Sequence, residues 1–277
     1  MYIFKTILEL QNLLHQNASV GFVPTMGALH EGHISLIEKS RFENEITVCS
    51  IFINPTQFNN QSDFEKYPVT IDSDIEKLIA AKTDVLFLPS LNEMYPKGME
   101  NIPIYDIGYL DTVLDGKFRP GHFNGVSLIV HKLLNAVQPH KLYLGEKDFQ
   151  QCLVIKRMIL LQKLNVEVIT CPTLRDDDGL AKSSRNTRLS AEARLKAPLI
   201  YNCLYAIKNN ISTIPFEQIQ QSCVQKLAQN GFETEYILLA NADNLEIMTD
   251  FDDTKKMIVL IASFLEGIRL IDNLRMN

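Results

Sequence analysis

The sequence predicts an α/β protein in which a doubly wound parallel sheet is followed by a smaller α+β domain. Three observations support this prediction. In the first part of the chain, short apolar runs alternate with helical patterns, as in βαβ units. Most of these runs stop at a proline or a glycine. After about Leu174 the order changes, because two helical patterns come first and three β-like runs follow them.

The elements of the first part follow from capping residues and apolar periodicity. Thr6 and Glu9 form a capping box, so we expect a helix to begin there. Residues 20–23 predict a strand that ends at Pro24, and residues 46–53 predict a strand buried on both faces. Further strands are predicted at 85–88, 141–144 and 166–171, with helices at 71–81, 126–137 and 149–164. The alternation is typical of a Rossmann-like sheet.

The second part has a different pattern, and we expect two domains, at residues 1–174 and 175–277. A polar turn at residues 176–179 precedes a helix at 191–209. Another helix begins at Pro215 and stops before Gly231. Strands are predicted at 235–240, 257–264 and 268–271, which completes a small α+β domain.

Composition excludes several classes of protein. The 277 residues carry a net charge of -6, which argues against a nucleic-acid binder that relies on clustered Lys and Arg. The longest apolar run, residues 257–265, is about half a bilayer span, so no membrane segment is expected. The 5 cysteines are widely spaced and never form a CxxC pair, which indicates reduced thiols and a cytoplasmic protein.

The strongest candidate site is the segment from Pro24 to His33, where the first long strand meets a helix. Backbone N–H groups and the positive end of the helix dipole face the ligand side there, and Gly27 and Gly32 allow close approach of a phosphate or an adenine. His30 and His33 are three residues apart and share one helix face, so both can donate hydrogen bonds to phosphate oxygens. A pair of surface histidines is the less favoured interpretation.

Two charged loops are further candidates. The segment 145–151 follows a predicted strand, and Lys147 could neutralise developing phosphoryl charge while Asp148 fixes the loop or a ribose hydroxyl. The segment 182–186 places Lys182, two serines and Arg185 side by side, which suits a polyphosphate. Either string alone is a weak signal, because charged turn residues usually face solvent.

Two further polar segments are candidates, one directly after a buried strand and one directly before a helix. The amides of Asn54 and Gln57 follow the second buried strand and would point toward a small substrate with hydroxyl and carboxylate groups. Residues 119–123 form a turn before a helix, and for His122 a structural role is favoured over a catalytic one.

Together these strings resemble the nucleotidylyltransferase and class I aminoacyl-tRNA synthetase superfamily, and most closely the pantoate–β-alanine ligase family. The strings that carry the resemblance lie, in this order, at residues 24–33, 54–58, 119–123, 145–151, 183–186 and 269–273. The resemblance implies a reaction in which pantoate and MgATP give pantoyl adenylate and diphosphate, after which β-alanine displaces AMP. It also implies a homodimer.

The resemblance also implies site residues. Catalytic roles fall to His30, His33 and Lys147, and pantoate is expected to contact Gln57, Gln151 and Asn54. ATP is expected to contact a larger set: Met26, Gly27, Ala28, Leu29, His30, Glu31, Gly32, His33, Gly145, Glu146, Lys147, Asp148, Leu174, Lys182, Ser183, Ser184 and Arg185. Lys182 stands where the family commonly has Leu, so it either adds a cation beside the phosphates or points to solvent. Asp72 and Asp74 could approach Mg²⁺, but no protein ligand is assigned to the metal.

Two other functions remain open at this point. A nucleotidylyltransferase would stop after transferring a nucleotide to a small phosphorylated substrate, although the amides of Asn54, Gln57 and Gln151 suit a diol and a carboxylate better than a second phosphate. A non-catalytic nucleotide sensor would never exchange diphosphate into ATP. A synthetase acting on tRNA is disfavoured, since the chain lacks a basic surface and an anticodon-binding domain.

Overall fold

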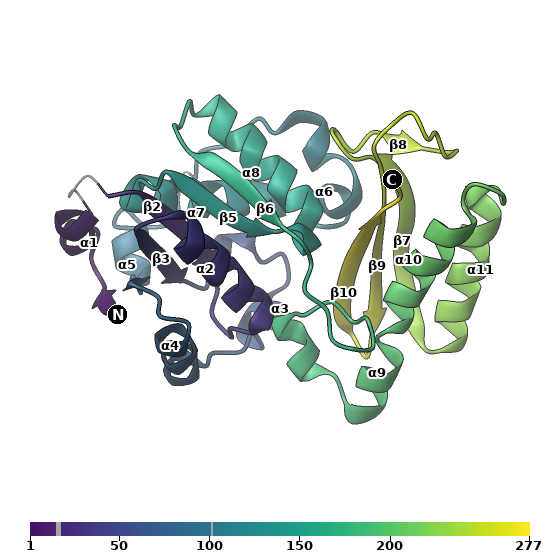
Figure 1. Cartoon of the computed structure of the whole chain (residues 1–277), viewed down its shortest axis with the longest axis horizontal. Coiled ribbons are helices and arrows are strands. Elements are labelled where there is room, and N and C mark those ends of the chain that lie inside the picture. The colour runs from purple at the N-terminus through teal and green to yellow at the C-terminus, as the bar shows by residue number, and fades with distance from the viewer. Residues whose placement is uncertain (15–17, 101) are drawn as a thin grey trace. The chain divides into compact units, whose positions relative to one another are not determined.

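A computed structural model describes residues 1–14, 18–100 and 102–277, and the chain divides into two units (Figure 1). The first unit comprises Met1–Glu146 and Gln150–Pro172, and the second comprises Lys147–Phe149 and Thr173–Asn277. The chain thus enters the second unit briefly before Gln150, and finally after Pro172, two residues before the expected boundary at Leu174. Each unit has its own sheet.

The first unit is built on a six-stranded sheet in the order β1-β4-β3-β2-β5-β6, in which all paired strands are parallel. The strands are β1 (Tyr2–Phe4), β2 (Val20–Thr25), β3 (Ile46–Ile51), β4 (Val85–Phe87), β5 (Lys141–Gly145) and β6 (Glu167–Cys171). From β2 the chain moves outward in one direction to β3 and β4, and in the other to β5 and β6. The predicted doubly wound sheet is confirmed, with its switch point between β2 and β5.

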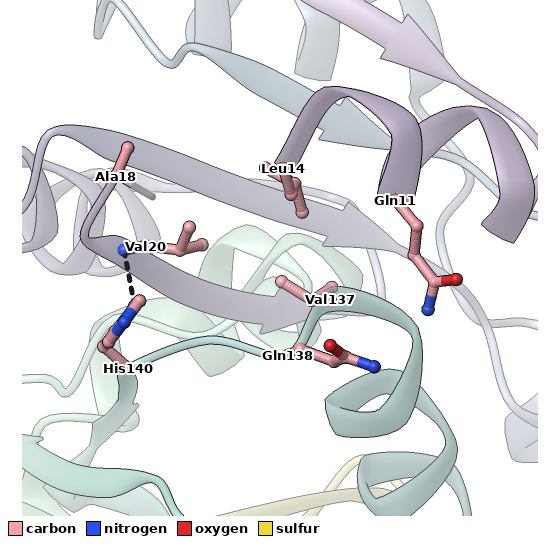
Figure 2. A pocket seen from close by; sticks show the side chains of 7 residues that line it. All are labelled: Gln11, Leu14, Ala18, Val20, Val137, Gln138 and His140. Atoms are coloured by element: carbon pink, nitrogen blue, oxygen red, sulfur yellow. Dashed lines mark hydrogen bonds between the residues drawn. The ribbon is translucent and has the colours of Figure 1, made fainter. Parts of the chain in front are cut away.

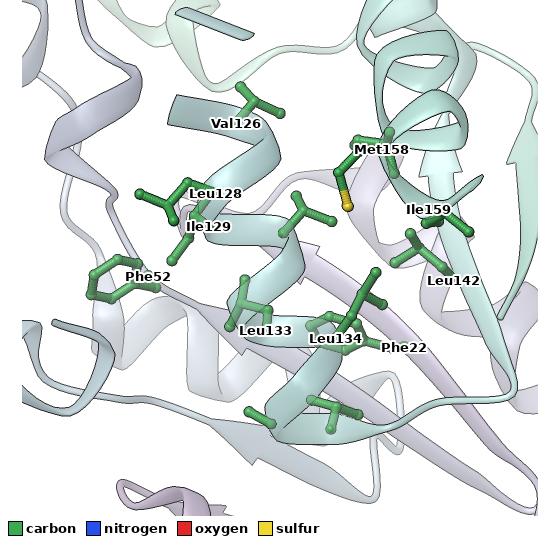
Figure 3. Close-up of a cluster of buried hydrophobic side chains, with 14 of the residues drawn as sticks. Phe22, Phe52, Val126, Leu128, Ile129, Leu133, Leu134, Leu142, Met158 and Ile159 are labelled. Carbon is green, nitrogen blue, oxygen red and sulfur yellow. The ribbon is translucent and has the colours of Figure 1, made fainter. Parts of the chain in front are cut away.

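Helices cover both faces of this sheet, and alternate residues of each strand point to opposite cores. Phe22 and Leu142 face a core built with α1 (Ile7–Leu14), α7 (His122–Val137) and α8 (Phe149–Leu161), part of which Figure 3 shows. Val23 and Tyr143 face the other core, built with α2 (Glu31–Glu43) and α4 (Ile71–Ala80). Shorter elements complete the unit: α3 (Gln61–Glu65), α5 (Leu91–Met94), α6 (Leu114–Phe118) and the 3₁₀ turns Pro55–Gln57, Gly108–Asp111 and Glu146–Asp148, the last of which runs on into the second unit.

Most predicted boundaries in this unit are correct to within a few residues, and the exceptions have local causes. Thr6 caps the first helix as expected, since its Oγ1 accepts from Glu9 N at 3.4 Å, while the Glu9 carboxylate accepts from Thr6 Oγ1 at 2.7 Å in place of the reciprocal backbone bond of a capping box. Pro24 lies inside β2 rather than after it, beyond the last residue that β2 pairs with β5, where a missing N–H costs little. Helix α7 begins at His122, before the predicted start at residue 126, because Gly121 supplies a left-handed N-cap (φ 80°).

The second unit has a four-stranded antiparallel sheet in the order β10-β9-β7-β8. Its strands are β7 (Phe232–Asn241), β8 (Ile247–Met248), β9 (Met257–Leu265) and β10 (Ile268–Arg275). Helices α10 (Leu199–Asn210) and α11 (Phe216–Gln229) lie beside each other against this sheet and close a separate apolar core (Figure 1). This is the α+β architecture that the sequence predicts.

One predicted helix of the second unit is wrong as a single element. The pattern at residues 191–209 forms α9 (Ala191–Lys196) and then α10, with Pro198 between them as the N-cap residue of the second helix. Proline cannot donate to the preceding turn, so the helix ends and restarts there. Among the described residues of both units, no helix is long and apolar enough to cross a bilayer.

Candidate active site

The loop that follows β2 occupies the edge of the sheet at which ligands bind in doubly wound folds. It runs from Met26 to the start of α2 at Glu31, and β2 lies next to β5, whose last residue is Gly145. Gly27 and Ala28 both have positive φ angles, 80° and 48°, so the chain turns sharply after the strand. The loop after β2 and the loop that begins at Gly145 therefore leave neighbouring strands at the same edge.

Asp74 holds this loop in place from α4. The carboxylate is fully buried, and it accepts hydrogen bonds from the N–H groups of Ala28 (2.9 Å) and Leu29 (2.7 Å). Thr70 Oγ1 donates to the same carboxylate, and Lys77 Nζ donates to the Leu29 carbonyl. The expectation that these backbone N–H groups face a ligand is therefore wrong, because a carboxylate of the protein already uses them.

His30 and His33 cap the first turn of α2 reciprocally. His30 Nδ1 accepts from Gly32 N at 3.1 Å, and His33 Nδ1 accepts from His30 N at 3.3 Å. Since an imidazole nitrogen that accepts carries no proton, both rings hold their proton on Nε2. The rings lie next to each other, with centroids 4.0 Å apart and planes inclined by 32°. Two Nε2–H donors are thus fixed side by side at a helix N-terminus, which is a suitable arrangement for phosphate oxygens.

The side-chain amides of Asn54 and Gln57, which follow β3, differ in their exposure and in their hydrogen-bond partners. Gln57 is partly exposed, and its Nε2 lies 2.8 Å from Met26 Sδ. Asn54 is fully buried, and both ends of its amide bond to protein groups. The structure therefore contradicts a direct substrate contact for Asn54, because the fully bonded amide has no hydrogen-bonding capacity left.

Near the starts of α8 and α7, one candidate side chain is accessible to a ligand and two polar side chains are buried in structural hydrogen bonds. Gln151 lies partly exposed in the first turn of α8, while its neighbour Gln150 is buried and bonds to loop backbone at Leu110 and Val113. His122 is buried, and its two ring nitrogens face Gln57 O and Arg119. The structural interpretation of His122 agrees with these contacts.

The remaining candidates lie in the second unit, apart from Gly145 and Glu146. Lys147 Nζ lies 3.6 Å from Asp148 Oδ1, and the Lys147 carbonyl accepts from Asn273 Nδ2 at 2.9 Å. The Arg275 guanidinium lies over the Phe149 ring, 5.1 Å from its centroid. Strand β10 thus fixes the segment that carries Lys147.

The segment from Leu174 to Arg185 folds back on itself. Lys182 N donates to Leu174 O, which brings the expected adenine contact close to the serine loop. Lys182 Nζ lies 2.6 Å from Asp176 Oδ1, so this extra cation is paired with a carboxylate of the chain. Ser183 caps the 3₁₀ turn Ser184–Arg188 by accepting from Arg185 N, and Ser184 is buried.

Arg175 anchors that segment to β10. It makes a two-pronged ion pair with the buried Asp272, at 2.5 and 3.0 Å, and its guanidinium stacks on the ring of Tyr201. A fork-to-fork pair of this kind fixes direction as well as distance. Residues 269–273 therefore contain two anchors. Asn273 holds the Lys147 carbonyl, and Asp272 holds the segment from Leu174 to Arg185 through Arg175.

Two further features of the described residues concern metal binding and a separate cavity in the first unit. Among residues 1–14, 18–100 and 102–277, no group of three or more His, Cys, Asp or Glu side chains is placed to hold a metal ion. A cavity of about 290 Å³ lies at the opposite, amino end of β2 (Figure 2). Its lining residues are Gln11, Leu14, Ala18, Val20, Val137, Gln138 and His140. None of them belongs to the loops described above.

Comparison with known proteins decides the family. A sequence model described as pantoate-beta-alanine ligase matches residues 2–275. The chain belongs to the pantoate–β-alanine ligase family. Among curated members of this family, the pantothenate synthetase of Cytophaga hutchinsonii is 45% identical over 96% of this chain and 95% of its own length. That of Bacteroides fragilis is 43% identical over 96% of this chain and 94% of its own.

Solved structures of the family agree. The pantothenate synthetase of Thermus thermophilus superimposes with a TM-score of 0.93 and 38% identity, over 100% of this chain and 99% of that one. The pantoate-beta-alanine ligase of Francisella tularensis, described as complexed with beta-gamma ATP and beta-alanine, gives a TM-score of 0.83 and 36% identity over 100% and 98%. The fold of this chain is that of the family throughout.

The sequence did not indicate which residues support the site: Asp74 was considered only for Mg²⁺, and neither Tyr95 nor Arg175 was a candidate. Asp74, Tyr95 and the Arg175–Asp272 pair act through contacts between residues 41 to 97 positions apart. Single-sequence patterns carry no signal for such pairs. Only the string that contains Asp272 and Asn273 was visible, and without a role for either residue.

Proposed function

We propose that this chain condenses pantoate with β-alanine at the expense of ATP and releases pantothenate, AMP and diphosphate. The observation that carries the proposal is the histidine pair, whose two Nε2–H groups are fixed at the carboxyl end of β2 beside β5. Membership of the ligase family and the related structure with an ATP compound and β-alanine support it.

In the first step, a carboxylate oxygen of pantoate attacks the α-phosphorus of ATP. The bond from that phosphorus to the bridging oxygen breaks, and diphosphate leaves. We propose that His30 and His33 donate to phosphate oxygens as charge builds there, and that Lys147 adds positive charge. Ser183, Ser184 and Arg185 are proposed to bind the leaving diphosphate, and Leu174 is proposed to contact adenine through backbone atoms.

In the second step, the amine of β-alanine attacks the acyl carbon of pantoyl adenylate. The bond between the acyl carbon and the AMP oxygen breaks, and the amine loses a proton as the amide forms. We propose that Gln57 and Gln151 hold pantoate through both steps. No covalent intermediate on the enzyme is required, which agrees with 5 cysteines that are all buried and form no disulfide.

We further propose that Mg²⁺ enters as part of MgATP. Asp74, one of two acidic residues considered for the metal, is committed to the loop backbone, and Asp72 is exposed on α4. A nucleotide that brings its own Mg²⁺ needs no all-protein cage. A homodimer and a cytoplasmic location are also proposed; the latter rests on the five free thiols.

The deciding experiment is exchange of labelled diphosphate into ATP, measured with and without pantoate and in the absence of β-alanine. Exchange that depends on pantoate is expected. Exchange that needs a phosphorylated acceptor instead would identify a nucleotidylyltransferase, and no exchange under any condition would identify a nucleotide sensor. Release of ADP rather than AMP in the complete reaction would also contradict the proposal.

A further inference from the structure

Asn54 has every hydrogen-bonding position of its amide occupied. Its Oδ1 accepts from Tyr95 OH at 2.6 Å and from Thr56 Oγ1 at 3.2 Å. Its Nδ2 donates to Gly125 O at 3.2 Å and to Gln57 Oε1 at 3.3 Å. An amide has two lone pairs and two protons to offer, so this set is complete.

The partners also fix which way round the Asn54 amide lies. Gly125 O is a backbone carbonyl and can only accept, so Nδ2 must face it. On the other side, burial raises the pKa of the Tyr95 hydroxyl, which therefore keeps its proton and donates it to Oδ1. Turning the amide over would place two acceptors against each other at Gly125, and the oxygen would lose the proton that Tyr95 donates.

The orientation of Asn54 determines that of Gln57. Because Asn54 Nδ2 donates to Gln57 Oε1, the oxygen of the Gln57 amide faces Asn54. The amino group faces Met26, with Nε2 at 2.8 Å from Sδ. Gln57 thus offers N–H, and not oxygen, to a molecule bound beside Met26.

The backbone of Gln57 is fixed from α7. His122 Nε2 lies 2.9 Å from the Arg119 guanidinium, which can only donate, so the His122 proton is on Nδ1. Nδ1 donates to Gln57 O at 2.7 Å. Helix α7 approaches so closely that a Cβ on Gly125 would overlap the Thr56 carbonyl. Both the backbone and the side chain of Gln57 are therefore held.

We infer that Tyr95 is a positioning residue for the pantoate site, where it acts through Asn54 to present Gln57 as a hydrogen-bond donor. This inference rests on the proposed function, in which Gln57 contacts pantoate. It has a consequence for specificity: the atom that meets Gln57 must be an acceptor oxygen, and a substrate analogue with only an amine there is rejected. Tyr95 itself is 5% exposed, and its hydroxyl bonds to Oδ1 of the Asn54 amide, whose Nδ2 bonds to Gln57.

The first test compares Tyr95→Phe with Tyr105→Phe. Tyr105 is a matched control in the same unit, since it is also buried and its hydroxyl bonds to His131 Nδ1 at 2.8 Å, outside the proposed relay. Loss of one hydrogen bond predicts that Tyr95→Phe raises the KM for pantoate roughly 2- to 10-fold, with the KM for ATP within about 2-fold of wild type. Tyr105→Phe should lower the melting temperature without changing either KM. Equal pantoate KM values in wild type and Tyr95→Phe would overturn the inference.

The second test is a double-mutant cycle with Gln57→Ala. If Tyr95 acts through Gln57, adding Tyr95→Phe to the Gln57→Ala enzyme should cause no further rise in the pantoate KM. A rise as large as in the wild-type background would show that Tyr95 acts by another route. An unchanged pantoate KM in Gln57→Ala alone would remove Gln57 from the site and overturn this inference, while pantothenate formation by the wild-type enzyme would leave the proposed function intact.

Discussion

His33 combines two functions that a single substitution would remove together. Its Nδ1 caps α2 by accepting from His30 N, and its Nε2–H is the proposed phosphate donor. We expect His33→Ala to slow adenylation by about 2 to 4 kcal/mol, roughly 30- to 1000-fold, because a donor to developing charge is lost. Diphosphate release in a single turnover measures this step. The lost cap should also lower stability by about 1 kcal/mol.

A second variant separates the two functions of His33. Asparagine can place an oxygen near the position of Nδ1 but has no group that reaches as far as Nε2. His33→Asn should therefore recover much of the stability lost in His33→Ala, as measured by urea unfolding, and none of the rate. Recovery of the rate with the stability would mean that the helix cap, and not the Nε2–H donor, accounts for the slow step.

At the scale of residues, the sequence indicates candidates for ligand contact more readily than it indicates the residues that hold those candidates in position. The histidine pair was predicted because its spacing and its position after a strand are local features. The use of the Ala28 and Leu29 N–H groups by Asp74 was not, because the carboxylate comes from a helix 45 residues further on. The same reason explains the mistaken substrate contact of Asn54, which is bonded to Tyr95 and Gly125.

At the scale of elements, an ion-pair cluster joins the end of α2 to β5. Glu43 lies 2.6 Å from Lys39 Nζ and accepts from Tyr143 OH at 2.8 Å. The hydrogen-bonded Lys39 and then Tyr143 lower the pKa of Glu43 from 4.5 to about 2. A carboxyl whose pKa is lower in the folded state stabilises the protein above pH 4.5 and loses that contribution as the pH falls toward 2.

This pH window can be tested with Glu43→Gln. Urea unfolding between pH 3 and 7 should show the variant less stable than wild type at neutral pH, with the difference shrinking as the pH falls below about 4.5. Glu192→Gln is the control, because it removes an exposed pair with Lys196 on α9 and should have a smaller effect at every pH. A difference for Glu43→Gln that stays constant over the whole range would rule out the charge as its cause.

The approach of α7 to the turn after β3 predicts another effect at this scale. Gly125→Ala should destabilise the enzyme by about 1 to 3 kcal/mol through overlap with the Thr56 carbonyl, and should raise the pantoate KM by displacing Gln57. Ser127→Ala, two residues along the same helix, is the control. The Ser127 hydroxyl is buried without a hydrogen-bond partner, so its removal should be neutral or slightly stabilising. Thermal unfolding and pantoate kinetics check both variants, and a Gly125→Ala enzyme with wild-type stability would contradict the described packing.

At the scale of the whole molecule, the two units have separate cores, two in the first unit and one in the second. Asp272→Asn leaves the Arg175 guanidinium without its buried carboxylate, which should cost about 3 to 5 kcal/mol locally. Hydrogen exchange should then become faster in β9 and β10 and remain unchanged in β2 and β3. Glu235→Gln, which breaks the more accessible pair with Arg269, should have a weaker effect. Equal loss of protection in both sheets would mean that the two units unfold together.

The order of elements was predictable from the sequence at this scale because it depends on periodicity. The alternation of apolar runs and helical patterns predicted the doubly wound sheet, and the change in element order after Leu174 predicted the second unit. The edge strand β1 was missed because it has three residues and leaves Tyr2 64% exposed. The assignment of Lys147–Phe149 to the second unit was also missed, since nothing local in that segment indicates its contacts with Asn273 and Arg275.

That assignment limits how the enzyme can be divided. A polypeptide that stops at Pro172 would contain the histidine pair, Lys147 and both glutamines proposed to contact pantoate, and so most of the residues of the proposed chemistry. It would lack Asn273, which holds the Lys147 carbonyl, and Arg275, which covers Phe149. If the gene is divided after Pro172, we therefore expect Lys147 to be held in place only when both fragments are present.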